Sequence, residues 1–291
     1  MALSAQDGNP PQKGFSLDPV QDIRARLQRV ADSPAADLAE GALLLAAEER
    51  PDLDVADALD VLDGIAASAA ARLRADADPG SARKVLVDEI FARRGFSGAA
   101  DDYDDPSNSF LDEVLARRRG IPITLSIVYV ATASRVGQRA VGVNAPGHFL
   151  LRHGDVVLDA FSGGREVPAD DFARRLRAAG VEDVEATAAH LLAHPPSHRE
   201  ILSRMLRNLK AIHLRRNQME RALADVDRLV LLNPDQPHWL RERAALYHRL
   251  GCTHAAISDL ERFCERAPAD PERDVVRRTL VQLVRSAPAV H

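Results

Sequence analysis

The sequence predicts an α+β protein in which helices flank a core with a small antiparallel sheet. Three observations lead to this prediction. Helical periodicity fills the first third, one helix and three strand-like runs occupy the middle, and a 34-residue repeat fills the last third. We place a disordered N-terminus at 1–17, a helical region and core at 18–185, and an all-α repeat module at 186–291.

The composition excludes several classes of protein. Hydrophobic residues make up 46% and charged residues 28%, as in a globular protein. No apolar stretch reaches the roughly 18 residues that a membrane helix needs, and the N-terminus lacks a basic-then-apolar signal. We therefore expect a cytoplasmic protein that does not bind a membrane. The two cysteines, Cys252 and Cys264, lack CxxC spacing and are expected to be buried free thiols.

Charge is distributed unevenly along the chain. Residues 1–110 contain 11 Lys and Arg against 21 Asp and Glu, whereas residues 199–291 contain 17 against 12. The acidic front and the mildly basic tail could dock on each other or on a partner. Dense basic clusters with interleaved aromatic residues are absent, so we expect no nucleic-acid partner.

The first third predicts several helices before the core. Ser33 and Pro34 suit the cap and the first position of one helix. Two more are expected where apolar residues recur at helical spacing. One spans 55–74, and the other follows a turn at Asp78–Ser81 and ends at Gly95. Asn108-Ser109 is expected to cap a further short helix.

Two clusters of acidic or imidazole side chains are candidate metal-binding sites. Asp101–Asp105 lacks the alternating ladder, central glycine and distal glutamate of a calcium loop. His190, His194 and His198 repeat every four residues, but two prolines interrupt that helix and no fourth ligand is evident. We therefore expect neither a metal nor a cofactor.

The stretch from Gly120 to Phe161 organises the middle of the chain. Pro122 suits the first turn of a helix, where its missing N–H would have no partner. Gly137 can adopt the left-handed conformation that ends a helix. Three short strand-like runs follow, at 141–143, 148–152 and 155–159.

The turn between the last two runs decides which residues face each other. A two-residue turn at His153-Gly154 places His148 opposite Asp159, with Cβ atoms roughly 5 Å apart. A turn at Gly154-Asp155 pairs His148 with Phe161 instead. We prefer the first register, in which the Asp159 carboxylate accepts the ring N–H of His148.

A combination of motifs resembles a known family. A helix entered through G-x-x, a glycine about 15 residues later, and His and Asp on successive strands give the overall layout. The specific residues are Gly98, Tyr103, Pro106, Asn108–Leu111, Arg118–Thr124, Pro146–Leu151, Asp159–Phe161 and Gly163-Gly164. Over about 34 to 285, the chain resembles the SirB1-type branch of the transglutaminase-like fold, which is related to papain-like proteases. The resemblance implies a papain-related core, a tetratricopeptide tail and a regulatory association without a defined substrate.

The chain departs from that family at the nucleophile position. Active transglutaminase-like enzymes carry a cysteine at the start of the helix, where the positive helix end lowers the pKa of a thiol. Counting two residues on from Gly120, or fifteen back from Gly137, gives Pro122. No cysteine precedes Cys252. The thiol chemistry that the resemblance implies is therefore missing from the core.

Two nearby hydroxyl groups remain as nucleophile candidates. Thr124 lies two residues past Pro122, about 200° around the helix, so it points elsewhere. Ser126 lies one turn further on and on roughly the same face as Pro122. A hydroxyl is a weaker nucleophile than a thiolate, and Ser126 can instead bond its own backbone.

The last third contains an internal repeat. Residues 206–234 align on 240–268 at an offset of 34, which matches the small residues Ala222 and Ala256. A 34-residue helix-turn-helix period that ends in proline is the tetratricopeptide signature. Such arrays usually need about three units, so we expect this module to pack on the core or to continue through flanking helices.

Two functions of different classes follow. In the first, a catalytically degenerate transglutaminase-like protein binds another protein or peptide through its groove and its tetratricopeptide tail. In the second, a Ser- or Thr-dependent peptidase, amidase or acyltransferase uses the His148–Asp159 pair with Ser126 or Thr124. Pro122 favours the first function, and the retained pair keeps the second open.

Overall fold

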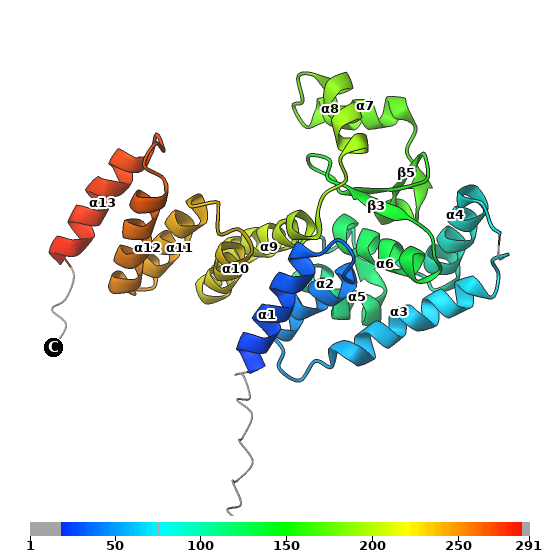
Figure 1. Ribbon diagram of the computed structural model, residues 1–291, viewed down its shortest axis with the longest axis horizontal. Coiled ribbons are helices and arrows are strands. Elements are labelled where there is room, and N and C mark those ends of the chain that lie inside the picture. Colours follow the sequence, from blue (N-terminus) through cyan, green and yellow to red (C-terminus); the bar gives the residue numbers. More distant parts are fainter. Residues whose placement is uncertain (1–18, 75, 287–291) are drawn as a thin grey trace, which may run out of the picture.

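The computed structural model describes residues 19–74 and 76–286, so the terminus expected to be disordered at 1–17 lies outside the described residues (Figure 1). Among the described residues, no helix is both long and apolar enough to cross a lipid bilayer. The fold is α+β, as predicted. Its α-helices are α1 (Pro19–Asp32), α2 (Leu38–Ala47), α3 (Val55–Ala70), α4 (Pro79–Val87), α5 (Leu111–Arg117), α6 (Pro122–Arg135), α7 (Ala169–Ala178), α8 (Val184–Ala193), α9 (His198–Arg215), α10 (Met219–Leu232), α11 (His238–Arg249), α12 (Thr253–Arg266) and α13 (Arg273–Ser286).

Helix α2 lies at the centre of the N-terminal region. Its leucines at 43–45 are fully buried, because α1, α3, α6 and α9 pack around the helix. The predicted start at Ser33 is wrong: the cap is Asp37, whose carboxylate accepts the N–H of Ala39 at 2.9 Å. The Ser33 carbonyl instead accepts the N–H of Ala36 in a turn that precedes the helix.

Helices α3 to α5 occupy the predicted regions with local differences. The predicted turn at Asp78–Ser81 is wrong, because Asp78 caps α4 and the helix begins at Pro79. Helix α3 ends at Ala70, and α4 continues into a π-helical turn before Gly95, whose φ of +75° ends it as expected. The predicted cap of α5 is wrong, because Phe110 holds that place and no side chain caps the helix. Asn108 lies in a 3-10 turn, where its Nδ2 donates to the Asp102 carbonyl at 2.8 Å.

The predicted central helix is confirmed as α6. Pro122 is its first residue, and Gly137, with a φ of +71°, follows its end. The side chains of Pro122–Arg135 are buried around most of the helix, against α3 on one side and the sheet on the other. A helix that is apolar all round belongs in a core, and α6 is that core helix.

The main sheet is antiparallel with strand order β3–β4–β5–β6, and two shorter strands pair in parallel beside it. The strands are β1 (Ser97–Gly98), β2 (Arg119–Gly120), β3 (Ala140–Val143), β4 (Leu150–His153), β5 (Val156–Asp159) and β6 (Arg165–Glu166). Helix α6 covers one face of the sheet, while α7 and α8 cover the other (Figure 1). Strand alternation produces these two layers: Leu151 and Leu158 join the main core, and Leu150 and Val157 pack with Phe172 of α7.

The register between β4 and β5 differs from the one we preferred. His153 pairs with Val156, so the two-residue turn is Gly154-Asp155. Gly154 has a φ of +60° and Asp155 does not have a positive φ, which is the pattern of a type II′ turn with glycine at its first central position. The alternative register is therefore the correct one, and His148 lies in the loop before β4.

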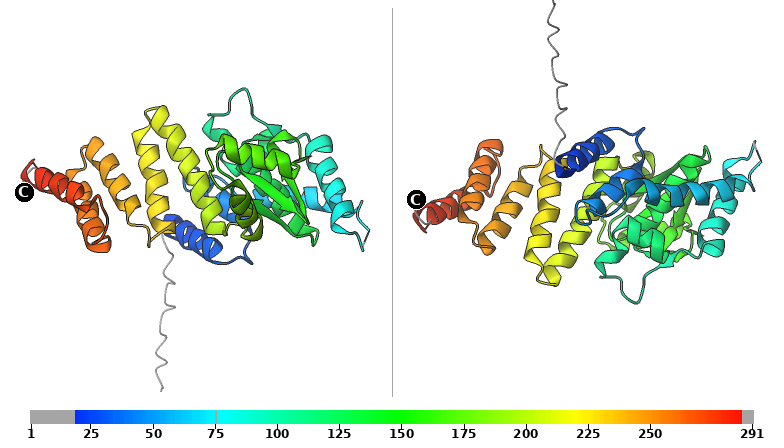
Figure 2. Two further views of the ribbon diagram at one scale, coloured as in Figure 1. Left: turned by 90° about the horizontal axis from the view of Figure 1, so that it is seen from above. Right: turned by 90° about the horizontal axis from the view of Figure 1, so that it is seen from below.

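The predicted repeats form α9 to α13, an arm that extends away from the sheet (Figures 1 and 2). Helices α9 and α10 pack as one pair and α11 and α12 as the next, with α13 against α12. Ala222 and Ala256 are fully buried within these pairs, because a small side chain lets helices approach closely. The expectation of two buried thiols is wrong: Cys252 is exposed at the start of α12 and Cys264 is half-buried.

A buried ionic network fastens the first repeat to α2. Arg228 of α10 is fully buried, and its guanidinium donates to Glu49 at 2.7 Å and to Asp225 at 3.0 Å. Arg262 occupies the equivalent position one repeat later, where its one ion-pair partner in the described part of the chain is Asp259 of its own helix, at 3.7 Å. Arg228 thus holds the first repeat against the core, whereas Arg262, at the same position of the second repeat, forms no ion pair with the described residues of the core.

Candidate functional site

The candidate site is built around the contact between His148 and Asp159. His148 Nε2 donates to Asp159 Oδ1 at 2.9 Å. The imidazole side chain is 29% exposed, whereas the carboxylate side chain is only 2% exposed. The contact expected from the sequence is present despite the different register, because the imidazole reaches the carboxylate from the loop before β4. A carboxylate held in this way fixes the ring orientation and leaves Nδ1 as the outer nitrogen.

Four more hydrogen bonds hold the Asp159 carboxylate. Arg175 of α7 donates to Oδ2 at 2.9 Å and the Ser162 hydroxyl to the same atom at 3.0 Å. The backbone N–H groups of Phe161 and Ser162 donate to Oδ1 at 3.1 and 3.4 Å. Sequence reasoning missed Arg175 and Ser162. Asp followed three residues later by Ser is typical of a local side-chain turn and could have indicated Ser162.

These partners keep Asp159 ionised. Burial alone would raise the pKa of Asp159, but the hydrogen bond from His148 and the charge and hydrogen bond of Arg175 outweigh burial. The pKa of Asp159 therefore lies well below its ordinary value. A buried carboxylate that stays charged can orient an imidazole and stabilise its protonated form.

The helix start that would carry a nucleophile offers no free hydroxyl. Pro122 is the first residue of α6 and is buried. Thr124 Oγ1 donates to the Asn108 carbonyl at 2.8 Å and accepts the N–H of Ile121 at 3.1 Å. Ser126 Oγ donates to the Pro122 carbonyl at 2.7 Å. Both hydroxyl-bearing residues are fully buried, and in the described chain neither bonds to His148.

Aromatic rings extend from His148 across the surface. The His148 ring stands edge-to-face against Phe161 at 6.1 Å, and Phe161 does the same against Tyr103 at 5.9 Å between ring centroids. Gly98 makes room for this arrangement, because a Cβ atom there would lie 2.6 Å from the Phe161 carbonyl oxygen and 2.7 Å from its ring. Tyr103 is 44% exposed. The retained His/Asp pair thus adjoins an aromatic surface.

Comparisons with known proteins identify the family. Residues 56–207 match the model of the transglutaminase-like superfamily, and residues 209–281 match a tetratricopeptide-repeat model. A UPF0162 protein of Xylella fastidiosa is 36% identical over 261 residues, covering 87% of this chain and 92% of that protein. The chain belongs to the transglutaminase-like superfamily. Its SirB1-type architecture, a transglutaminase-like core followed by tetratricopeptide repeats, agrees with the motifs in the sequence.

Two further relatives support this placement of the transglutaminase-like protein. A UPF0162 protein of Pseudomonas aeruginosa is 36% identical over 251 residues, covering 84% of this chain and 89% of that protein. Protein SirB1 of Salmonella typhimurium is 25% identical over 211 residues, covering 71% of this chain and 77% of that protein. No solved structure matches the chain.

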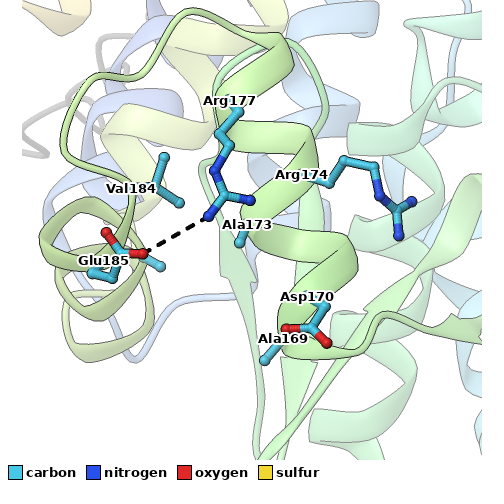
Figure 3. A pocket seen from close by; sticks show the side chains of 8 residues that line it. Ala169, Asp170, Ala173, Arg174, Arg177, Val184 and Glu185 are labelled. Atoms are coloured by element: carbon cyan, nitrogen blue, oxygen red, sulfur yellow. Dashed lines mark ion pairs between the residues drawn. The ribbon is translucent and has the colours of Figure 1, made fainter.

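A depression of about 500 Å³ lies between α7 and α8 of this transglutaminase-like protein (Figure 3). Arg177 reaches across it toward Glu185, at 3.8 Å, and Arg174 lines it as well. Arg175, between these two arginines in the sequence, points instead to Asp159. Because no candidate site residue lines the depression, it is a separate feature of α7.

The three spaced histidines serve other contacts. His190 and His194 stack on each other at 4.4 Å between ring centroids. His198 Nδ1 donates to the Val30 carbonyl at 3.2 Å, which ties the start of α9 to α1. Within the part of the chain that the structure describes, no group of three His, Cys, Asp or Glu side chains could hold a metal ion.

Proposed function

We propose that this transglutaminase-like protein is a non-catalytic, regulatory module of the cytoplasm. It binds a protein or peptide partner through the surface around His148 and through its tetratricopeptide helices. Tetratricopeptide repeats generally mediate contacts between proteins, which supports a partner of this class.

The observation that carries the proposal is the state of the helix start. Pro122 supplies no nucleophilic atom, and the hydroxyls of Thr124 and Ser126 are committed to main-chain carbonyls. A nucleophilic hydroxyl must pass its proton to a base, and His148 is the base that this scaffold retains. Because neither hydroxyl bonds to His148 and both are fully buried, the geometry favours binding over acyl transfer.

A Ser- or Thr-dependent hydrolase or acyltransferase is the second candidate. The intact His148–Asp159 pair favours it, since such a pair can orient and polarise a nucleophile. Ser162 is the hydroxyl that bonds to this pair, but it donates to the carboxylate and not to the imidazole. This candidate therefore needs Ser126 or Thr124 to leave its backbone bond before reaction.

A labelling experiment separates the two functions. The full chain is treated with a fluorophosphonate probe and with an activated acyl probe, and labelled peptides are mapped by mass spectrometry. We expect no labelling within 56–207, because neither hydroxyl is free to react. Thiol-directed probes should modify the exposed Cys252 and nothing in the core.

Ser126→Ala and Thr124→Ala are the matched variants. Stoichiometric labelling of the wild type at either residue, lost in the corresponding variant, would overturn the non-catalytic proposal and establish the hydrolase. Mapping the label on the wild type keeps the test decisive even if one variant folds poorly.

A further inference from the structure

Arg204 of helix α9 is a cation beside the candidate site, and it has no ionic partner among the described residues. Arg204 is half-buried, and its Nη1 donates to the side-chain oxygen of Asn144 and, at 2.9 Å, to the Ala145 carbonyl. Both acceptors are neutral. Among the described residues, no carboxylate lies within ion-pair distance of Arg204, so its charge is left uncompensated.

Three other deeply placed arginines are each neutralised by two carboxylates. Arg228 pairs with two carboxylates, and so do Arg243 and Arg135. Withdrawing a guanidinium from water is costly unless an opposite charge accompanies it. Burial lowers the pKa of Arg204, and the positive charge of Arg207 lowers it further. Arg204 therefore occupies a position where an added anion would be stabilised.

The donors of Arg204 that face outward form a site together with Arg207. The Nε and Nη2 groups of Arg204 bond to nothing in the described chain, and neither atom is buried. Arg207 follows at the i+3 position of the same helix, is exposed, and has no partner among those residues. A guanidinium group with free donors matches the geometry of a carboxylate, and Arg207 adds a second positive charge on the same helix.

An aromatic surface continues from these cations toward His148. The Arg204 guanidinium lies 5.3 Å from the centre of the Phe149 ring. Phe149 follows His148 in the chain, and Arg204 also bonds to Asn144 and Ala145, so the guanidinium lies against the loop that carries His148. From His148 the rings continue through Phe161 to Tyr103, as described above. The surface therefore has a positively charged end, formed by Arg204 and Arg207, next to a partly exposed row of rings from Tyr103 to His148.

We propose that Arg204, Arg207 and the row from Tyr103 to His148 form a binding surface for an acidic peptide segment. The two guanidinium groups hold a carboxylate, and an apolar side chain next to it in the peptide lies on Tyr103 and Phe161. This inference rests on the proposed binding function and deepens it by naming the class of ligand and the residues that hold it.

The surrounding charges favour a peptide over a polyphosphate. Asp101, Asp102 and Asp104 lie in the same loop as Tyr103, and Asp104 is already paired with Arg215 at 2.6 Å. Asp101 and Asp102 pair with Arg119, so the uncompensated positive charge lies at the Arg204–Arg207 end of the surface. A ligand with a few carboxylates there fits better than a dense polyanion such as a nucleic acid, which carries charge along its whole length. A peptide that alternates acidic and apolar side chains matches two cations followed by aromatic rings.

The test measures peptide binding to the full chain by fluorescence anisotropy. One probe is a fluorescein-labelled ten-residue peptide that alternates Glu with Phe, and its twin carries Gln in place of Glu. We expect the Glu peptide to bind at least about tenfold more tightly than the twin, with an affinity that falls as salt rises. Tyr103→Ala should weaken binding of both peptides.

Charge reversal supplies the matched control. Arg207→Glu should weaken the Glu peptide by about tenfold or more, because a like charge would then face the carboxylate. Arg221→Glu makes the same change at an exposed, unpaired position of α10 and should leave the affinity within about twofold. Arg207 is exposed and forms no hydrogen bond or ion pair with the described residues, so we expect Arg207→Glu to fold as the wild type does.

Three results would overturn this inference: equal affinity for the two peptides, no binding of either, or no effect of Arg207→Glu. Arg204 would then have only the role of holding the loop at Asn144. Each of these results leaves the non-catalytic proposal standing, because that proposal is decided by nucleophile labelling and not by these peptides.

Discussion

Replacing Asp159 with asparagine tests whether a buried charge organises the candidate site. The carboxylate accepts hydrogen bonds from His148, Arg175 and Ser162 and from two backbone N–H groups. Asparagine keeps one acceptor oxygen and turns an NH2 group toward these donors. Breaking a buried ion pair typically costs about 3–5 kcal/mol. Because Arg175 is 38% and His148 29% exposed, solvent screens part of that interaction, and we expect a loss of about 2–3 kcal/mol.

The pH dependence of this loss has a defined sign. The pKa of Asp159 in the folded protein lies well below its value in the unfolded chain, about 3.9. The stabilisation is therefore fully present above the unfolded pKa and is lost as the pH falls through the folded one. Asp159→Asn cannot titrate, so the difference in stability between wild type and variant should shrink as the pH is lowered from about 5.

Urea denaturation followed by circular dichroism measures both effects, at pH 7 and in steps down to pH 3. Asp101→Asn is the control, since the Asp101 side chain is 91% exposed and its one ion-pair partner among the described residues is Arg119, at 3.4 Å. That variant should lie within about 0.5 kcal/mol of wild type. An Asp159→Asn protein as stable as wild type, or a stability difference that does not change with pH, would refute the reasoning.

Two further changes test the packing around the site. Arg228→Ala should lower the free energy of unfolding by about 3–5 kcal/mol, because it leaves Asp225 buried without its cation, whereas Arg221→Ala on the exposed face of α10 should change it by less than about 0.5 kcal/mol in the same urea titration. Gly98→Ala should destabilise by about 1–3 kcal/mol, since its Cβ would lie 2.6 Å from the Phe161 carbonyl oxygen. Gly64→Ala, in an open position of α3, should stabilise by up to about 1 kcal/mol, and a thermal melt that ranked these two variants the other way would contradict the packing argument.

Some features of the site depend only on local sequence and could be predicted from it. Pro122 starts α6 and Gly137 follows its end, because a missing N–H and a positive φ are properties of single residues. The 34-residue period predicts the helical pairs of the arm for a similar reason, since each repeat is a local helix-turn-helix unit. The contact of His148 with Asp159 could also be predicted from the sequence, because only two short strands and a turn separate the residues.

The register of β4 and β5 depended on a choice that the sequence leaves open. Two adjacent turns, His153-Gly154 and Gly154-Asp155, each contain glycine, and each satisfies the local rules. Packing selects the second. In that register Leu158 pairs with Leu151 in the main core, while Val157 joins the cluster beneath α7 and α8. Moving the turn by one residue shifts each partner by two residues, so both registers keep Leu151 and Leu158 on the same face of the sheet. The registers differ in which side chains lie directly opposite each other, and that is decided by packing across the sheet and not by the turn.

The charges that define the site were determined by tertiary structure alone. Arg175 reaches Asp159 from α7, and Arg228 reaches Glu49 from α10, 179 residues away along the chain. Arg204 lies against the loop before His148, with no carboxylate among the described residues within ion-pair distance, although both flanking regions are rich in charge. Composition and spacing determine how many cations and anions the chain carries. Only the packing of helices determines which of them meet, because ion pairing depends on distance in space and not on separation in sequence.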